Sequence, residues 1–388
     1  MKRIELPERT EDFTADPVEL FFDLAYVFAF SQLVGVLLHE PNWSGIGRVA
    51  LLFGLLWLPW QQLTWAANAV SGNGRPIRLV FLAATVASVP MAAATSTALG
   101  NGGLTFALSL TVIMVLGFAV QALSADRNSG FGRAITRWMI PTAIAVVVLV
   151  AGALVEGGAR TVLWVASVLI VLFGMASAGS GEWVLRSGHM AERHGLIVII
   201  ALGEVIVAIG LPVVESLAEE PGISALTVGA LVASGTFAAL LWWAYFDRPS
   251  VALEHGSEMQ VSARGRGSYT RDVYAFAHAP IVAGVVLSAV ALEQATLHPS
   301  DPVPQSFRLM LLAGLVFFQM GIAAAIGRAY RALAVERVVV AALLVVVALI
   351  SGSWDGIWLI TVVVLILAVS LWVEHVRLER PTPQPSTD

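Results

Sequence analysis

The sequence predicts an all-α fold, a polytopic integral membrane helix bundle with about twelve transmembrane helices. Of its 388 residues, 57% are hydrophobic and only 13% are charged, whereas a soluble domain carries about 25% charged residues. The mean hydropathy is +0.81. Apolar runs of about 20 residues, the length that crosses a hydrocarbon layer, recur from one end of the chain to the other.

Twelve apolar runs follow one another, separated mostly by short connections with turn residues such as Ser71-Gly72-Asn73-Gly74. The longest connection, residues 248–271, is polar. Residues 1–17 form a predicted N-terminal segment, and residues 377–388 a predicted disordered tail. We expect the spans at residues 18–38, 46–70, 77–99, 104–124, 138–155, 161–179, 194–212, 224–246, 272–292, 307–327, 334–351 and 356–375.

The distribution of Lys and Arg tests the number of spans and orients them. With twelve spans, 19 of the 22 Lys and Arg residues fall on the side that holds both termini. Only Arg48, Arg160 and Arg308 fall on the other side. The positive-inside rule therefore predicts a multi-pass protein of the cytoplasmic (inner) membrane with both termini in the cytoplasm. A missed span would invert every later loop and spoil this split.

Composition also excludes several kinds of chemistry. The chain has no cysteine, which rules out disulfides, thiolate catalysis and Cys-ligated metals. The basic residues are not concentrated in any patch, so we do not expect nucleic acid as a partner. We predict no cofactor and no metal: His189 and Glu192 have a spacing that can share a metal, but a second such pair is missing. Besides the lipid bilayer, the expected partner is an unidentified small molecule, lipid or ion.

A weak internal repeat divides the chain into two halves of six spans, residues 18–180 and 181–376. Glu19 and Glu192 stand at the openings of the first and seventh spans, 173 residues apart. Trp65 and Trp243 are 178 apart, and Pro90 and Pro280 are 190 apart. Two halves with six spans each have the same orientation, which predicts a parallel repeat. Chance matching of common membrane residues is the alternative.

Glu204 lies near the middle of the span 194–212. It is about 12 residues, and so ~18 Å, from Glu192, close to the centre of a ~30 Å hydrocarbon layer. A carboxylate at that depth costs at least ~2.5 kcal/mol, so it normally faces protein or water and carries a function. Glu204 is therefore the first candidate for proton or ion coupling.

The first span carries two carboxylates on one helical face, Glu19 and Asp23, four residues apart. Glu19 alone is explained by favourable placement at a helix N-terminus. Asp23 lies deeper, so we expect a partner for it, and Asp23 and His278 are the further candidates for proton or ion coupling. Arg193 could neutralise either carboxylate; alternatively it is a solvent-exposed residue of the positive-inside kind. Glu192 and Asp247 complete the predicted charge network.

Aromatic and polar residues mark two further helix ends. Trp57, Gln61, Trp65 and Asn68 follow one face of the span 46–70 and are predicted to line a cavity; an interfacial aromatic belt with interhelical hydrogen bonds is the alternative. His278 either titrates near neutral pH or is a neutral side chain bonded to a carbonyl that Pro280 leaves free. The remaining predicted cavity-lining residues are Trp242, Trp243 and Tyr274.

Several of these segments resemble the low temperature requirement protein A (LtrA) family of bacterial membrane proteins. The resemblance covers about residues 13–375. The family's name records a requirement for growth in the cold. It implies the membrane fold and the importance of these positions, but no reaction, substrate or cofactor. The matching segments are Glu19 to Leu24, the Trp-rich end of 46–70 with Asn68, Glu192 to Leu196 with Leu202-Gly203-Glu204, Trp242 to Asp247, and Tyr274 with His278 and Pro280.

Three functions stay open on the sequence. The first is a secondary transporter, proton-coupled at Glu204, with Asp23 and Arg193 as a cytoplasmic gate. The second is a non-transporting membrane protein of cold adaptation, with a sensor, assembly or structural role. The third is an enzyme acting on lipid at the cytoplasmic leaflet, with Asp23, Glu192 and His278 in acid–base roles. No nucleophile elbow, metal box or nucleotide loop supports the third, so an enzyme is the less favoured class.

Overall fold

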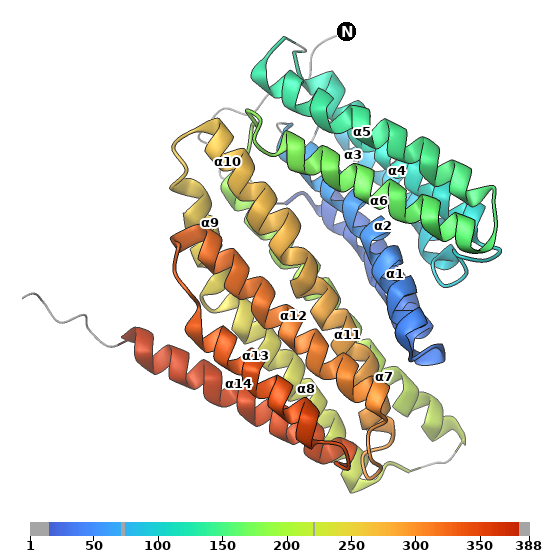
Figure 1. The fold of residues 1–388 in the computed structure, drawn as a ribbon, viewed down its shortest axis with the longest axis vertical. Helices are drawn as coiled ribbons and strands as arrows, with labels where there is room; N and C mark the ends of the chain where they lie inside the picture. The colour runs from blue at the N-terminus through green and yellow to red at the C-terminus, as the bar shows by residue number, and fades with distance from the viewer. Residues whose placement is uncertain (1–14, 71–73, 127, 220–221, 380–388) are drawn as a thin grey trace, which may run out of the picture.

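The computed structural model describes residues 15–70, 74–126, 128–219 and 222–379, and the regular elements within them are helices (Figure 1). Our expectations for residues 1–14, 71–73 and 380–388 lie outside the described residues. The elements are α1 (Pro17–His39), α2 (Trp43–Asn68), α3 (Arg75–Ala94), α4 (Gly103–Ser124), α5 (Gly130–Ala153), α6 (Gly157–Ala178), α7 (Ser187–Glu219), α8 (Ala225–Phe246), α9 (Pro249–Glu258), α10 (Ala263–Thr270), the π-helix η1 (Arg271–Ala277), α11 (His278–Leu297), α12 (Gln305–Tyr330), α13 (Val335–Ile350) and α14 (Gly356–Glu379).

All twelve predicted spans are helical, which confirms the all-α membrane bundle. In the described part of the chain, ten helical stretches are long and apolar enough to cross a membrane. The other two predicted spans are α2, whose second half is rich in polar side chains, and α13, which has 16 residues. Two differences concern polar segments: α7 is much longer than the span expected at 194–212, and the connection 248–271 folds into α9 and α10.

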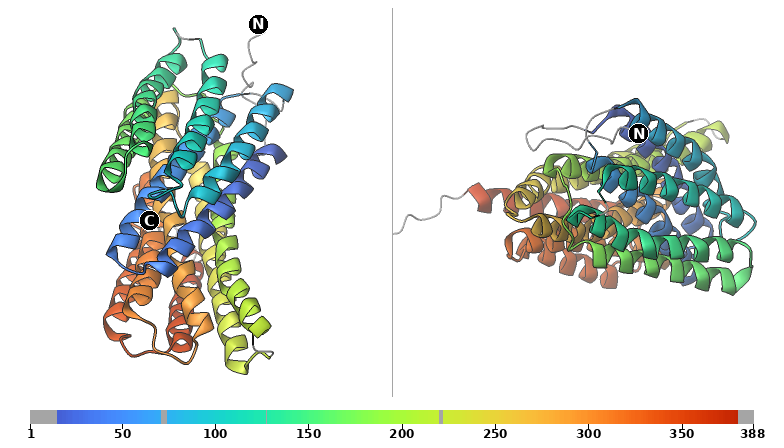
Figure 2. Two further views of the ribbon diagram at one scale, coloured as in Figure 1. Left: turned by 90° about the vertical axis from the view of Figure 1, so that its right-hand side faces the viewer. Right: turned by 90° about the horizontal axis from the view of Figure 1, so that it is seen from above.

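The helices form two neighbouring bundles, α1–α6 and α7–α14. In the left view of Figure 2, most of the blue-to-green first bundle lies above the red part of the second bundle, while the gold segment of α10 and α11 rises beside the green helices. Within the first bundle, α3 packs on α1 and α4, and α5 packs on α4 and α6. Within the second, α11 is enclosed by α7, α8, α12 and α14. The bundles meet where α1 packs against α7 and α11, and where α2 packs against α7.

The first and last described residues lie at the same end of the helix assembly. The backbone N–H of Ala15 donates to Glu192 at the start of α7 (2.6 Å). His375, near the end of α14, contacts Arg248, which follows α8 (3.4 Å). We call this end the N-terminal end and the other, where α1 reaches His39, the far end. An even number of spans requires this arrangement.

α1 begins at Pro17 because Asp16 caps it. The Asp16 carboxylate accepts the backbone N–H of Val18 (2.9 Å), and Glu19 accepts the backbone N–H of Asp16 (3.4 Å), so the two form a capping box. Proline is favoured in the first turn because the N–H that it lacks would have no partner there. Glu19 therefore has the helix-terminus role that the sequence offered as one interpretation, and this role fixes the depth of Asp23 one turn later.

At the far end, Arg160 of α6 holds three helix ends together. Its side chain is buried, with 6% of the residue exposed. It donates to the carbonyls of Ala98 and Gly100, after α3, and to those of Gly152 and Val155, at the end of α5. The last carbonyls of a helix have no partner within that helix. A buried guanidinium is a fitting partner because it offers five N–H donors.

Replacing Arg160 by methionine should therefore destabilise the protein by about 2–3 kcal/mol, since several buried carbonyls lose their donor. Unfolding in detergent micelles, followed by far-ultraviolet circular dichroism, measures this. Arg48→Met is the matched control: Arg48 is also a far-end arginine, but it is half exposed and paired with Glu40, and should cost at most ~1 kcal/mol. Equal effects of the two substitutions would contradict the proposed role.

Candidate functional site

A buried ion pair joins the two bundles where α1 packs against α7. Both guanidinium Nη atoms of Arg193 donate to Asp23, at 2.8 and 2.9 Å, in the two-pronged geometry typical of strong arginine–carboxylate pairs. Trp60 of α2 donates its indole N–H to the same carboxylate (2.8 Å). The Arg193 carbon Cζ lies 5.6 Å from the centre of the Trp60 ring. Arg193 and Asp23 are at most 1% exposed, so each charge depends on the other.

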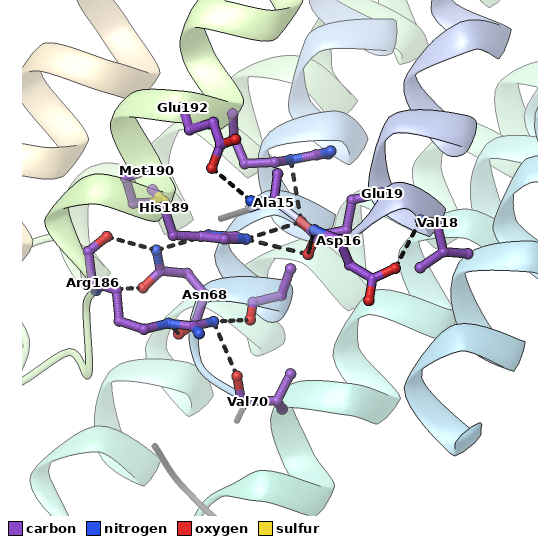
Figure 3. A network of polar contacts seen from close by, with 12 residues as sticks. Ala15, Asp16, Val18, Glu19, Asn68, Val70, Arg186, His189, Met190 and Glu192 are labelled. Carbon is purple, nitrogen blue, oxygen red and sulfur yellow. Dashed lines mark hydrogen bonds and ion pairs between the residues drawn. The ribbon is translucent and has the colours of Figure 1, made fainter. Parts of the chain in front are cut away.

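Glu19 extends this pair toward the N-terminal end. Its carboxylate lies 3.4 Å from Arg193 Nε and 3.1 Å from His189 Nε2. His189 and Arg193 are four residues apart on α7, as Glu19 and Asp23 are on α1, so the two helix faces match turn by turn. Figure 3 shows Glu19 and His189 pointing toward each other between the two helices. These are the carboxylates that the sequence offered as partners of Arg193.

Asn68 of α2 continues the network on the other side of His189 (Figure 3). Its amide nitrogen donates to His189 Nδ1 (3.2 Å) and to the carbonyl of Arg186 (3.0 Å). Its amide oxygen accepts the backbone N–H of Arg186 (2.7 Å). With Nδ1 accepting from an amide, His189 must carry its proton on Nε2, which then donates to Glu19. The chain of contacts from Asn68 to Asp23 thus has consistent donors and acceptors.

Next to the ion pair, two side chains of α2 and one of α7 close the space between the bundles, together with backbone carbonyls of η1. Trp57 donates to the carbonyl of Ala275 (2.9 Å), and Gln61 donates to that of Tyr274 (3.2 Å). Gln61 also contacts His194 Nε2 (2.9 Å). These two carbonyls lie in the π-helical turn that precedes Pro280, where the regular α-helical ladder is interrupted. The irregular turn therefore supplies the acceptors that bind the first bundle to the second.

His278 and His194 are both neutral in this arrangement. His278 Nδ1 donates to the carbonyl of Val273 (2.9 Å), and its Nε2 accepts the hydroxyl of Tyr245 (2.7 Å). His194 Nδ1 donates to the carbonyl of Met190 (2.8 Å), and its Nε2 accepts from Gln61. Each ring has one donor contact and one acceptor contact, which is the pattern of a neutral imidazole. For His278, the acceptor is the carbonyl of Val273, seven residues before Pro280, and not a carbonyl that Pro280 leaves free as the sequence interpretation had it.

Two of the cavities that the described residues line lie at opposite ends of the molecule. The N-terminal cavity has a volume of about 1130 Å³ and reaches His189 and Glu192 on α7, together with residues of α9 and α10. The far cavity, about 740 Å³, opens between α1, α2 and the α3–α4 connection, and Ser31 is among its lining residues. The buried ion pair and the layer of Trp57, Gln61 and His194 line neither cavity, and the N-terminal cavity continues along α7 as far as Ile199.

Glu204 lies on the far side of this closed layer and contacts α1. Its Oε2 is 2.5 Å from the hydroxyl of Ser31, and the residue is 2% exposed. Ser31 is the hydrogen-bond partner of Glu204 at this depth, a contact that was not predicted from the sequence. The two residues are 173 positions apart, the same offset that separates Glu19 from Glu192.

Some predicted residues lie away from this arrangement. Trp242 and Trp243 are 46% and 52% exposed on α8 and line neither cavity, so the cavity-lining prediction does not hold for them. Their helix has its Trp-rich end on the outer surface, where the aromatic-belt interpretation fits. Asp247 is partly exposed and pairs with its neighbour Arg248 (3.4 Å) rather than with the network.

The other predicted cavity-lining residues are packed rather than cavity-facing. Trp65 is buried against Trp138 and Trp183, with ring centres 5.7 and 4.7 Å away. Tyr274 packs against the His194 ring, 4.9 Å between centres. Trp57, Gln61 and Asn68 join helices through the hydrogen bonds described above and line neither cavity.

Sequence reasoning missed four members of the arrangement: Ser31, Trp60, His194 and Arg186. The α-helical spacing of α2 offered a signal for Trp60, because Trp60 is three residues from Trp57 and therefore lies near it on the helix surface. A serine in an apolar span carries no comparable signal. In the described part of the chain, no three His, Cys, Asp or Glu side chains are grouped so as to hold a metal ion.

Comparison with known proteins gives a family but no biochemical role. Residues 14–371 match the model of the family described as bacterial low temperature requirement A protein (LtrA). An uncharacterized protein of Rhizobium meliloti is 30% identical over 332 residues, which cover 81% of this chain and 77% of the relative. No solved structure matches the chain significantly.

Proposed function

From the premise that this chain belongs to the bacterial low temperature requirement A (LtrA) family of membrane proteins, we propose that it is a secondary transporter, coupled to protons through Glu204. Its substrate would be a small molecule or ion. In this proposal, the charged layer of Asp23, Arg193 and Glu19 is the gate that closes the path between the two cavities. Glu204 carries the proton on the far side of that gate.

The observation that carries the proposal is the pair of cavities at opposite ends, separated by one closed layer. A carrier needs a route from each side to a central site and must never have both routes open together. The N-terminal cavity passes His189, beside the charged layer, and ends at Ile199 on α7, while the far cavity ends at Ser31, beside Glu204. This is the arrangement expected of a carrier in a closed state.

The two bundles would be the moving parts, with residues 18–180 and 181–376 as the proposed repeat units. Supporting this, α1 packs on α3 and α7 packs on α11, and these pairs are equivalent if the repeat holds. Ser31 and Glu204, at the repeat offset of 173, contact each other. Residues at equivalent positions meet in this way when an axis of rotation passes between α1 and α7. Rocking about that axis would open one cavity and close the other.

The proposed location is the cytoplasmic (inner) membrane, with the N-terminal end of the bundle facing the cytoplasm. The excess of Lys and Arg at that end supports this orientation through the positive-inside rule. The gate residues then lie on the cytoplasmic side of Glu204. The proton would reach Glu204 when the outer route is open and leave it when the inner route is open.

Glu204→Gln tests the proton-coupling role, because it keeps the size and hydrogen-bonding capacity of the side chain but cannot ionise. Purified protein in liposomes with a trapped pH dye is exposed to a library of solutes, and solute-driven proton movement is recorded. We expect the wild-type protein to show it for at least one solute class and Glu204→Gln to lose it while exchanging the same solute. Glu215→Gln, an exposed glutamate on the same helix, is the control and should behave as wild type.

Two outcomes would reject parts of this proposal. A folded Glu204→Gln variant that still moves protons with the solute removes Glu204 from the coupling role. A folded wild-type protein that moves no solute favours a second candidate, a non-transporting membrane protein whose charged layer is structural. The pairing of Arg193 with both Asp23 and Glu19 is the observation that supports this candidate.

A further inference from the structure

The far cavity has both polar and apolar lining residues, and it ends at Ser31, the partner of Glu204. Its opening is formed by the His39 end of α1, the start of α2 and the α3–α4 connection. Arg48 and Glu40 form an ion pair there (2.6 Å). The residues that matter for access to Glu204 are Ser31, Gln32, Gly35, His39, Glu40 and Asn101. The polar members of this lining favour water, so solvent can approach Ser31 from the far end.

At the inner limit of this cavity, one hydroxyl proton serves two acceptors. Ser31 Oγ lies 2.5 Å from Glu204 Oε2 and 3.2 Å from the carbonyl of Val27. A serine has a single O–H donor, so it satisfies only one of these oxygens when Glu204 is ionised. If Glu204 is protonated, its own O–H donates to Ser31 Oγ, and Ser31 donates to Val27. The geometry therefore accommodates one additional proton and satisfies every acceptor in that state.

Few other charges surround this pair. On α11, Glu293 is half-buried and interacts electrostatically with Glu204 and with Glu215 of α7. α8, which also packs on α7, has no charged residue between Ala225 and Phe246. On α1 and α2 the charged or titratable groups near the far end are His39, Glu40 and Arg48. No cation pairs with Glu204 in the described contacts, so a proton is the simplest neutralising ligand.

On the other side of Glu204 the path is closed by apolar packing. Ile197, Val198 and Ala201, within the two turns of α7 that precede Glu204, are each fully buried. Beyond them lies the Asp23–Arg193 pair. The N-terminal cavity reaches along α7 only to Ile199, about 7 Å before Glu204 along the helix axis. Water at the N-terminal end therefore has no polar route to the carboxylate in this state.

From this geometry we propose that the far cavity is a proton-loading vestibule: Glu204 exchanges its proton with the far-side solution through Ser31. A hydronium ion in the cavity gives one proton to Glu204, and the Ser31 hydroxyl turns from Glu204 to the Val27 carbonyl. Release reverses these changes, so the serine is unchanged. The inference rests on the proposed coupling role of Glu204 and adds the side from which the site is loaded.

Cysteine accessibility tests the vestibule directly, because the chain has no native cysteine. A membrane-impermeant thiol reagent is applied to one side of oriented vesicles that hold a single-cysteine variant. Gly35→Cys is suitable because a side chain there meets no atom within 4 Å. We expect complete labelling of Gly35→Cys and Ser31→Cys from the far side and none from the other side. Ala191→Cys, in the N-terminal cavity, should show the reverse.

Ala29→Cys is the matched control on α1, since Ala29 is fully buried and lines neither cavity. It should stay unlabelled from both sides. Labelling of Ser31→Cys from the N-terminal side would overturn the proposed direction of access. The proposed access would also be overturned if Gly35→Cys were not labelled from the far side while Ala191→Cys was labelled normally in the same preparation.

Infrared difference spectroscopy separates proton loading from transport. A pH change on the far side alone should alter the absorption of a protonated carboxyl, and Glu204→Gln should lack that signal. Ser31→Ala should retain the signal but respond more slowly. A signal that follows only the pH on the N-terminal side, or one unchanged in Glu204→Gln, would reject the vestibule. A correct signal without any solute flux keeps the vestibule and rejects only the transporter. Replacement of pH sensitivity by sodium sensitivity would reject the proton as ligand.

Discussion

Arg193→Met should lower the free energy of unfolding by about 3–5 kcal/mol, because it leaves Asp23 as a buried charge without its partner. Asp23 is 1% exposed and receives both Nη atoms of Arg193. The Trp60 indole N–H would be its one remaining donor among the described contacts. Titration with sodium dodecyl sulfate in mixed micelles, followed by far-ultraviolet circular dichroism, measures the loss. Arg264→Met, which breaks an exposed pair with Glu182, should cost at most ~1 kcal/mol.

The double variant Asp23→Asn/Arg193→Met identifies the cause. If the loss comes from an uncompensated charge, neutralising Asp23 should recover a large part of it, and the two substitutions should be strongly non-additive. Additive losses would mean that Arg193 acts through packing against Trp60 instead. Because Asn keeps one oxygen and a similar size, the double variant also preserves the hydrogen bond from Trp60.

This energy limits how the proposed gate can work. Opening a path along α1 and α7 by separating Asp23 from Arg193 would cost several kcal/mol unless another group took the place of one partner. A ligand shifts a conformational equilibrium only through its different affinity for the two states. A charged substrate that pairs with Asp23 or Arg193 as they separate would supply that difference. The gate and the substrate site would then share residues, which agrees with the position of His189, the neighbour of Glu19, in the lining of the N-terminal cavity.

The sequence predicted the helices and part of the charged layer for the same physical reason. An apolar run of spanning length is recognisable in the sequence as a membrane helix. A charged residue within such a run is costly in lipid, so the sequence also indicates that it has a partner. Asp23 required a cation, and Arg193 was at a matching depth on the seventh span. The same reasoning could not place Trp242 and Trp243, because tryptophan is favourable both at a membrane interface and in a packed core.

Side-chain contacts between helices could not be predicted from the sequence, because they depend on which helices lie next to each other in the membrane plane. Ser31 is an ordinary residue of a membrane helix until Glu204 lies opposite it. The π-helical turn η1 was also not predictable in detail. Pro280 indicated a local irregularity, but the sequence does not show which carbonyls of that turn accept hydrogen bonds from other helices. Trp57 and Gln61 come from α2, more than 200 positions away.

Gly284 is the second position where a single substitution should have a large effect, because two helix backbones touch there. A Cβ at Gly284 of α11 would lie 2.3 Å from the carbonyl oxygen of Gly314 on α12, and one at Gly314 would lie 2.6 Å from that of Gly284. Small residues permit this close approach in membrane bundles, where packing rather than the hydrophobic effect holds helices together. Because the obstructing atoms are backbone, no rotamer change relieves the clash.

We therefore expect Gly284→Ala to cost about 1–3 kcal/mol and Gly284→Leu more, by forcing α11 and α12 apart. The same micelle titration measures both. Gly229→Ala on α8 is the control: its Cβ would meet no atom within 4 Å, so alanine there should be neutral or stabilising, given its higher helix propensity. A neutral Gly284→Ala would mean that the two backbones do not meet. Since α11 also carries His278 and packs against α7, the displacement should disturb the layer between the cavities, and Gly284→Leu should lose solute exchange that Gly229→Ala keeps.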